Sequence, residues 1–139
     1  MVGNIGWTNE QWQAFKDLPR DTPLNMLNLV RVLDRANYPD GRAATGHEAY
    51  QAYGRESGPV LAKVGGSILW RGSFEAMLIG PGDERWDYAF IARYPDAGAF
   101  LAMVTDPVYQ DAVKHRQAAV ADSRLIRCGE IGTGGGFAG

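Results

Sequence analysis

The sequence predicts an α+β domain in which one antiparallel sheet carries helices on a single side. Three observations lead to this prediction: a strand that is apolar on both faces, a fixed order of further strands and helices, and a length of 139 residues. A chain of this length is typical of one domain with a hydrophobic core of its own.

The strand predicted over residues 24–32 carries apolar side chains on both of its faces. Asn28 interrupts the first face and Arg31 interrupts the second. Such a strand has to be covered on both sides, and the chain's own helices readily supply only one cover. The apolar side chains are Met26, Val30 and Val32 on the first face, and Leu27 and Leu29 on the second.

A helix is predicted before this strand, over residues 7–18. Thr8 and Gln11 have the spacing of a capping box, in which each side chain binds the backbone of the other residue. Pro19 and Pro23 end the helix and lead into the strand.

A second helix is predicted after a polar loop, from about residue 47 to residue 64, where apolar residues recur at helical spacing. Gly54, Gly58 and Pro59 are expected to kink or split this helix. A Gly-Gly pair, residues 65–66, follows as its C-terminal cap.

Two strands joined by a turn are predicted next, over residues 67–79 and 87–94. In the first of them strict alternation places Trp70 on one face and Arg71 on the other. The turn between the strands is rich in glycine, proline and charged residues, as hairpin turns often are.

The last part of the chain is predicted to be helical from Pro95 to about residue 121. Asp106 and Pro107 restart the helix, since aspartate is a good cap and proline suits the first helical position. A final strand over 123–128 follows. The Gly-rich end, residues 131–139, has no packing face and is expected to be a mobile tail.

The order of elements is an extra helix followed by β-α-β-β-α-β, which is the ferredoxin-like pattern. We divide the chain into an N-terminal helical extension (1–22), the ferredoxin-like domain (23–129) and a Gly-rich tail (130–139). The second apolar sheet face predicts a homodimer in which two such faces pack together across a two-fold axis. The alternative is a monomer whose N-terminal helix and tail cover that face.

Composition excludes several classes of protein. The formal charge of −2 is spread along the chain without a basic stripe, so nucleic acid is not expected as a partner. No apolar run approaches the roughly 18 residues of a membrane span, and the N-terminus lacks the features of a signal peptide. Cys128 is the only cysteine, which favours a reducing compartment. We therefore expect a cytoplasmic protein without membrane contact.

His115 is the most informative titratable residue. A histidine on the last helix can act as a general base or bind haem or a metal, and Asp111 one turn earlier lies on the same helical surface. The structural alternative is a half-exposed histidine paired with Asp111. Only two histidines are present, so a three-histidine zinc site within one chain is excluded, and no metal is expected.

Polar residues on the predicted strands are candidates for ligand binding. Asn28 on an inward face needs a hydrogen-bonding partner, either a ligand oxygen or a neighbouring strand. Arg31, Arg71 and Arg93 lie on three strands. They form either ion pairs with acidic residues or a guanidinium clamp for a carboxylate.

Aromatic residues can line a pocket between the sheet and the helices or belong to the core. The set comprises Tyr50, Tyr53, Trp70, Phe90 and Tyr94. His47, at the start of the second helix, is predicted to be a surface residue outside any site.

Several motifs, taken in order, resemble an uncharacterised bacterial family of unknown function within the dimeric α/β-barrel superfamily. The resemblance covers about residues 24–126 and implies the ferredoxin-like fold and a dimer formed through the sheets. It implies no single reaction, because related barrels include monooxygenases, haem-degrading enzymes, isomerases and cyclases. The motifs are Met26-Leu-Asn-Leu-Val-Arg31, Glu48-Ala-Tyr-x-x-Tyr53, Gly66-x-x-x-Leu-Trp-Arg-Gly72, Leu78-Ile-Gly80, Arg93-Tyr-Pro95, Phe100-Leu-x-Met-Val104, Asp106-Pro-x-Tyr109, His115-Arg116 and Asp122-Ser-Arg-Leu-Ile126.

The leading hypothesis is a homodimer that holds one small aromatic or carboxylate-bearing molecule per subunit between sheet and helices. If the protein is an enzyme, we expect either metal-independent proton transfer or monooxygenase-type chemistry. His115 would act as the base, and Asn28 would orient a substrate oxygen. Tyr50, Tyr53, Trp70 and the three strand arginines would bind the ligand. The alternatives are a non-catalytic ligand-binding or regulatory dimer, and a haem-binding protein that uses His115. No cofactor is expected, and haem is the one alternative.

Overall fold

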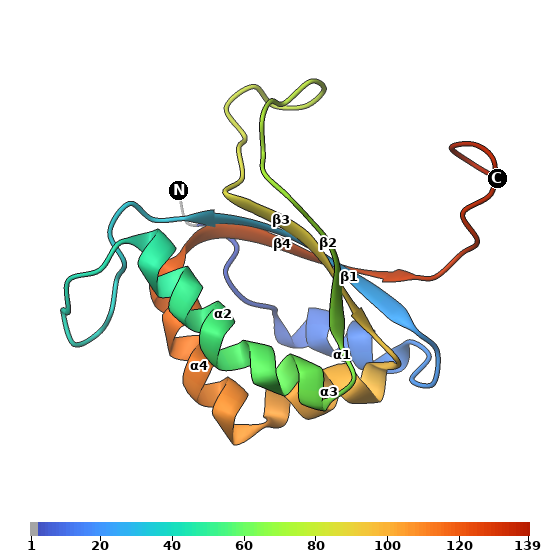
Figure 1. Ribbon diagram of the computed structural model, residues 1–139, viewed down its shortest axis with the longest axis horizontal. Coiled ribbons are helices and arrows are strands. Elements are labelled where there is room, and N and C mark those ends of the chain that lie inside the picture. Colours follow the sequence, from blue (N-terminus) through green and yellow to red (C-terminus); the bar gives the residue numbers. More distant parts are fainter. Residues whose placement is uncertain (1–2) are drawn as a thin grey trace.

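The computed structural model describes residues 3–139 and has a four-stranded antiparallel sheet with its helices on one side (Figure 1). The strands follow each other across the sheet in the order β2-β3-β1-β4, which confirms the ferredoxin-like prediction. The elements are α1 (Asn9–Asp17), β1 (Leu24–Val32), α2 (Gly46–Lys63), β2 (Ser67–Gly72), β3 (Tyr88–Tyr94), α3 (Ala97–Thr105), α4 (Pro107–Ala119) and β4 (Val120–Gly129).

The predicted helix ends are confirmed in detail. Thr8 caps α1 and forms the expected capping box with Gln11. Asp106 caps α4 by accepting a hydrogen bond from the Val108 amide, with Pro107 at the first helical position. After α2, Gly65 adopts a φ of 81°, a conformation that favours glycine.

Two predictions about the central elements need correction. Helix α2 is not split at Pro59 but continues to Lys63, because its packing against α4 offsets the one backbone hydrogen bond that a proline removes. Strand β2 ends at Gly72 instead of continuing to Ile79. The alternation of apolar residues does continue beyond Gly72, but a strand also needs a neighbouring backbone to pair with, and this segment has none in a single copy.

The alternation predicted for β1 is confirmed. Leu24, Met26 and Val30 lie buried beneath the helices. The opposite side of the sheet, called the outer face below, carries no helix in Figure 1. Its apolar side chains, assigned from the strand register, are Leu27, Leu29, Trp70, Ile91 and Ile126.

Neither end of the described chain covers the outer face, so the alternative in which the N-terminal helix and the tail shield it does not hold in this structure. Helix α1 packs through Trp12 and Phe15 against Phe100, on the helical side of the sheet. The tail extends away from the sheet, and its Ile131 and Phe137 are fully exposed. None of the described helices is both long and apolar enough to cross a membrane.

Candidate functional site

An open depression of about 350 Å³ lies where β2 and β3 leave the sheet. We call it the sheet-edge depression. Both strands contribute to it, since Gly72 at the end of β2 pairs with Ala89 near the start of β3. Its lining residues are Arg71, Gly72, Ser73, Asp87, Tyr88, Ala89 and Phe90.

The register places a cation and an aromatic ring side by side in this depression. Arg71 pairs with Phe90 across β2 and β3, and Phe90 pairs with Asn28 across β3 and β1. Directly opposed residues project to the same side of a sheet, so all three face the helices. Within residues 3–139 the Arg71 guanidinium forms no ion pair, which leaves its donors available to a ligand.

Tyrosines from α2 extend this aromatic surface. The Tyr50 ring lies 4.6 Å from the Tyr88 ring and 5.4 Å from the Tyr53 ring, measured between centroids. Tyr53 also shares a 2.8 Å hydrogen bond with the hydroxyl of Tyr109. Burial raises the pKa of both Tyr50 and Tyr53, so their phenols remain protonated at neutral pH.

His47 lies on the surface, as the sequence predicts, with 57% of its side chain exposed, and it contacts two of the residues that line this depression. Its Nδ1 lies 3.0 Å from the Tyr88 hydroxyl, and its Nε2 lies 4.0 Å from Asp87 Oδ1. The other Asp87 oxygen accepts a 2.8 Å hydrogen bond from the Val32 amide, which fixes the carboxylate. Burial and the nearby Asp87 charge raise the pKa of Tyr88, so its hydroxyl stays protonated at neutral pH and can donate to Nδ1 of His47.

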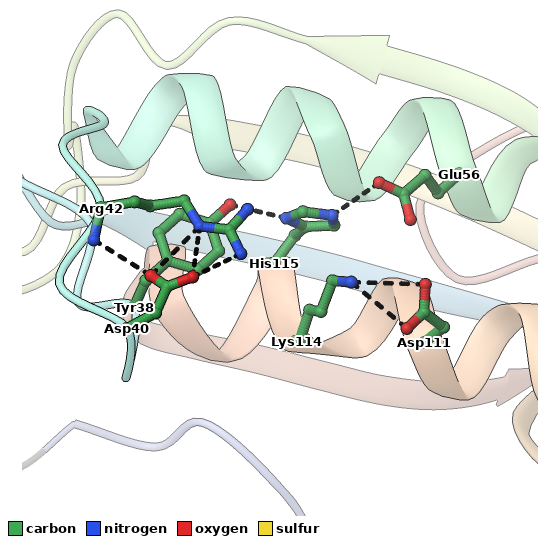
Figure 2. A network of polar contacts seen from close by, with 7 residues as sticks. All are labelled: Tyr38, Asp40, Arg42, Glu56, Asp111, Lys114 and His115. Carbon is green, nitrogen blue, oxygen red and sulfur yellow. Dashed lines mark hydrogen bonds and ion pairs between the residues drawn. The ribbon is translucent and has the colours of Figure 1, made fainter.

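His115 lies in a separate polar network between α2 and α4 (Figure 2). Its side chain is buried, with Nδ1 2.6 Å from the Tyr38 hydroxyl and Nε2 2.6 Å from Glu56 Oε2. A carboxylate oxygen accepts, so the contact with Glu56 favours the tautomer with the proton on Nε2, in which Nδ1 accepts from the Tyr38 hydroxyl. The resulting Tyr38–His115–Glu56 relay joins the loop before α2 to both helices.

The Tyr38 end of this relay is held by an ion pair. The Arg42 guanidinium lies 4.4 Å from the centre of the Tyr38 ring and 2.7 Å from an Asp40 oxygen. This guanidinium lowers the pKa of Asp40 to about 2, so the carboxylate is ionised at neutral pH. This local pair at the surface positions the Arg42 guanidinium over the Tyr38 ring.

The expected pairing of His115 with Asp111 is wrong. Asp111 pairs with Lys114 at 3.2 Å, and His115 points instead toward Glu56 on the neighbouring helix. No cluster of three metal-binding side chains occurs within residues 3–139. Since both His115 nitrogens are engaged, an iron could bind there only by displacing Tyr38 or Glu56.

The predicted site residues therefore separate into three places. Asn28, Tyr50, Tyr53 and Arg71 lie on the helical side of the sheet, and His115 lies between the helices. Arg31, Trp70 and Arg93 lie on the outer face.

One of these placements has a clear local cause, and two of the polar residues have partners within the chain. A β-bulge between Ile68 and Trp70 turns Trp70 away from the helices, which corrects the predicted pocket. Arg93 pairs with Glu130, as the ion-pair interpretation expects. Asn28 donates a 3.0 Å hydrogen bond to the Met26 carbonyl of its own strand.

Comparisons place this chain among known proteins. The model of a family described as a domain of unknown function (DUF1330) matches residues 42–128. The crystal structure of methylated RPA0582 protein is 57% identical, covers 97% of this chain and 100% of that one, and has a TM-score of 0.94. A second structure of RPA0582, from Rhodopseudomonas palustris, is 56% identical, covers 94% of this chain and 99% of that one, and has a TM-score of 0.91.

More distant structures share the fold alone. A dimeric protein of unknown function with a ferredoxin-like fold from Bacteroides fragilis is 13% identical, over 78% of this chain and 96% of that one, with a TM-score of 0.50. SnoaB, a cofactor-independent oxygenase from Streptomyces nogalater, is 16% identical. The match covers 81% of this chain and 96% of that one, with a TM-score of 0.50. No curated protein matches this chain.

Proposed function

The chain belongs to the DUF1330 family of domains of unknown function, and we propose that it binds a small aromatic carboxylate as a homodimer. The observation that carries this proposal is the sheet-edge depression. A free guanidinium, Arg71, lies there beside the rings of Tyr88 and Phe90. A planar guanidinium recognises a carboxylate through two parallel hydrogen bonds, and the rings offer an apolar surface for an aromatic group.

The homodimer is supported by the outer face of the sheet. Trp70 and Ile126 expose about half of their surface there, and Leu27, Leu29 and Ile91 continue the same apolar area. Contiguous apolar patches of this kind commonly mark protein–protein contacts. Two such faces are self-complementary across a two-fold axis, because each copy presents the same patch to the other.

Replacing Arg71 by methionine tests the binding proposal. Methionine keeps much of the side chain's length but removes the charge, so benzoate and phenylacetate are expected to bind about 10- to 100-fold more weakly. Isothermal titration calorimetry measures the affinities, with benzamide as the uncharged probe. Arg55→Met, on exposed α2 surface, is the matched control. Equal benzoate affinity in the wild type and Arg71→Met would show that Arg71 does not hold the ligand.

A second candidate function, proton transfer, is favoured by the position of His47. His47 can take the hydroxyl proton of Tyr88, which lines the depression, and Asp87 lies 4.0 Å from the other ring nitrogen, so Tyr88 and His47 together have the arrangement of a general base. His47 takes this role in place of His115, whose nitrogens are both engaged away from the depression. The competing class is a binding module without chemistry.

Exchange of a carbon-bound proton separates these two classes. Phenylpyruvate is an aromatic carboxylate with an acidic C–H bond, so NMR in deuterated water measures base-catalysed exchange. We expect the wild type to accelerate this exchange and His47→Gln to lower the acceleration by about 100-fold, while His115→Gln leaves it unchanged. Binding of phenylpyruvate without accelerated exchange would identify a binding module.

A further inference from the structure

The segment between β2 and β3, residues 73–87, projects far from the sheet (Figure 1), and we call it the arm. Leu78 and Ile79 lie next to each other near its tip, with 93% and 91% of their surfaces exposed. From Ser73 to Trp86 the one backbone hydrogen bond runs from the Glu84 amide to the Pro81 carbonyl. Two adjacent large aliphatic side chains without cover are unfavourable in water and suit an interface.

The arm rises on the side of the sheet where a second copy would pack. In Figure 1 the helices lie on one side of the sheet, and the arm rises on the other, which is the side of the outer face. Packed sheets lie about 10 Å apart. At about 3.3 Å per extended residue, the chain from Gly72 to Ile79 reaches roughly 20 Å. The tip of the arm therefore extends past any second sheet that packs on the outer face.

The charges of the arm are complementary to those of the outer face. The arm carries the carboxylates of Glu75, Asp83 and Glu84 and one cation, Arg85, none of which forms an ion pair within residues 3–139, so these unpaired charges are net acidic. Arg31 on the outer face likewise has no ion-pair partner in the described chain. Opposite charges on the rim of an interface steer association and fix its register.

We propose that the arm of each copy clasps a second copy of the same chain, which buries Leu78 and Ile79 against it. This inference rests on the proposed homodimer and deepens it, since the interface then includes the arms as well as the outer faces. The base of the arm also borders the sheet-edge depression, because Ser73 and Asp87 belong to both.

The variant L78E/I79E tests the clasp. Both side chains are exposed in a single copy, so the variant is expected to fold normally and to weaken the dimer about 100-fold. Sedimentation equilibrium measures the dimer dissociation constant, and circular dichroism checks the fold. Ile131→Glu is the matched control, because it adds a charge to an equally exposed aliphatic position in the tail. The control is expected to keep the wild-type constant.

The outcomes separate the clasp from the homodimer on which it rests. A wild type that sediments only as a monomer of about 15.2 kDa at micromolar concentration overturns both. A wild-type dimer whose dissociation constant is unchanged in L78E/I79E overturns the clasp alone and leaves the outer faces as the interface. A photo-crosslinking amino acid at position 78 gives a second measurement, in which crosslinks between copies support the clasp and their absence from the dimer contradicts it.

Discussion

Replacing Gly46 by alanine is expected to destabilise the protein by about 3 kcal/mol or more. A Cβ atom at this position would lie 1.9 Å from the Leu33 carbonyl oxygen and 2.9 Å from the Leu33 nitrogen. These are backbone atoms, so no change of side-chain rotamer relieves the overlap. The first turn of α2 would have to move away from the end of β1, to which its Thr45 cap and the loop over Tyr38 are tied.

Urea unfolding followed by circular dichroism measures the effect. A lowered midpoint with an unchanged slope would show a loss of stability without a change in the folded state. The matched control is Gly54→Ala in the same helix, where an added Cβ meets nothing within 4 Å. That variant is expected to gain about 0.5–1 kcal/mol from helix propensity. Similar midpoints for the two variants would show that a Cβ atom at position 46 does not overlap unfavourably with the Leu33 backbone.

Replacing Ile126 by glutamate is expected to weaken the homodimer by at least about 100-fold. Ile126 is 46% exposed in a single copy and lies on the outer face, beside Leu27 across β1 and β4. In the proposed dimer the new carboxylate would be buried in an apolar interface without a partner. In the monomer the same carboxylate would remain in contact with water, so the fold should persist.

Analytical ultracentrifugation at micromolar concentration detects this change as a shift from dimer to monomer. Val108→Glu is the matched control, because Val108 is 56% exposed on α4, on the opposite side of the molecule. It is expected to leave the dimer intact. Dissociation of both variants would indicate general destabilisation, and dissociation of neither would argue against the outer face as the interface.

Much of the fold could be predicted because the relevant signals are local. The alternation in β1 and the caps at Thr8, Asp106 and Gly65 each depend on residues only a few positions apart. These local signals, taken in order, were enough to predict the ferredoxin-like topology. They did not predict the end of β2. Apolar and polar residues continue to alternate past Gly72, but no neighbouring strand pairs with the chain beyond that residue.

The surroundings of the candidate residues depend on register and on distant contacts, which the sequence does not reveal. One β-bulge in β2 turns Arg71 toward the helices and its neighbour Trp70 toward the outer face. His47 lies on the surface as predicted, but only the fold brings it to Tyr88, 41 residues away. No sequence signal at either residue marks this contact.

The sequence by itself therefore determined the type and order of the elements and the apolar character of both faces of β1. These properties follow from periodicity and capping, which act over one or two turns of chain. Only the tertiary structure decided which side chains meet, as for Tyr38 and His115, which lie 77 residues apart. Such contacts depend on strand register and helix packing, and a shift of a single residue in register changes every partner along a strand.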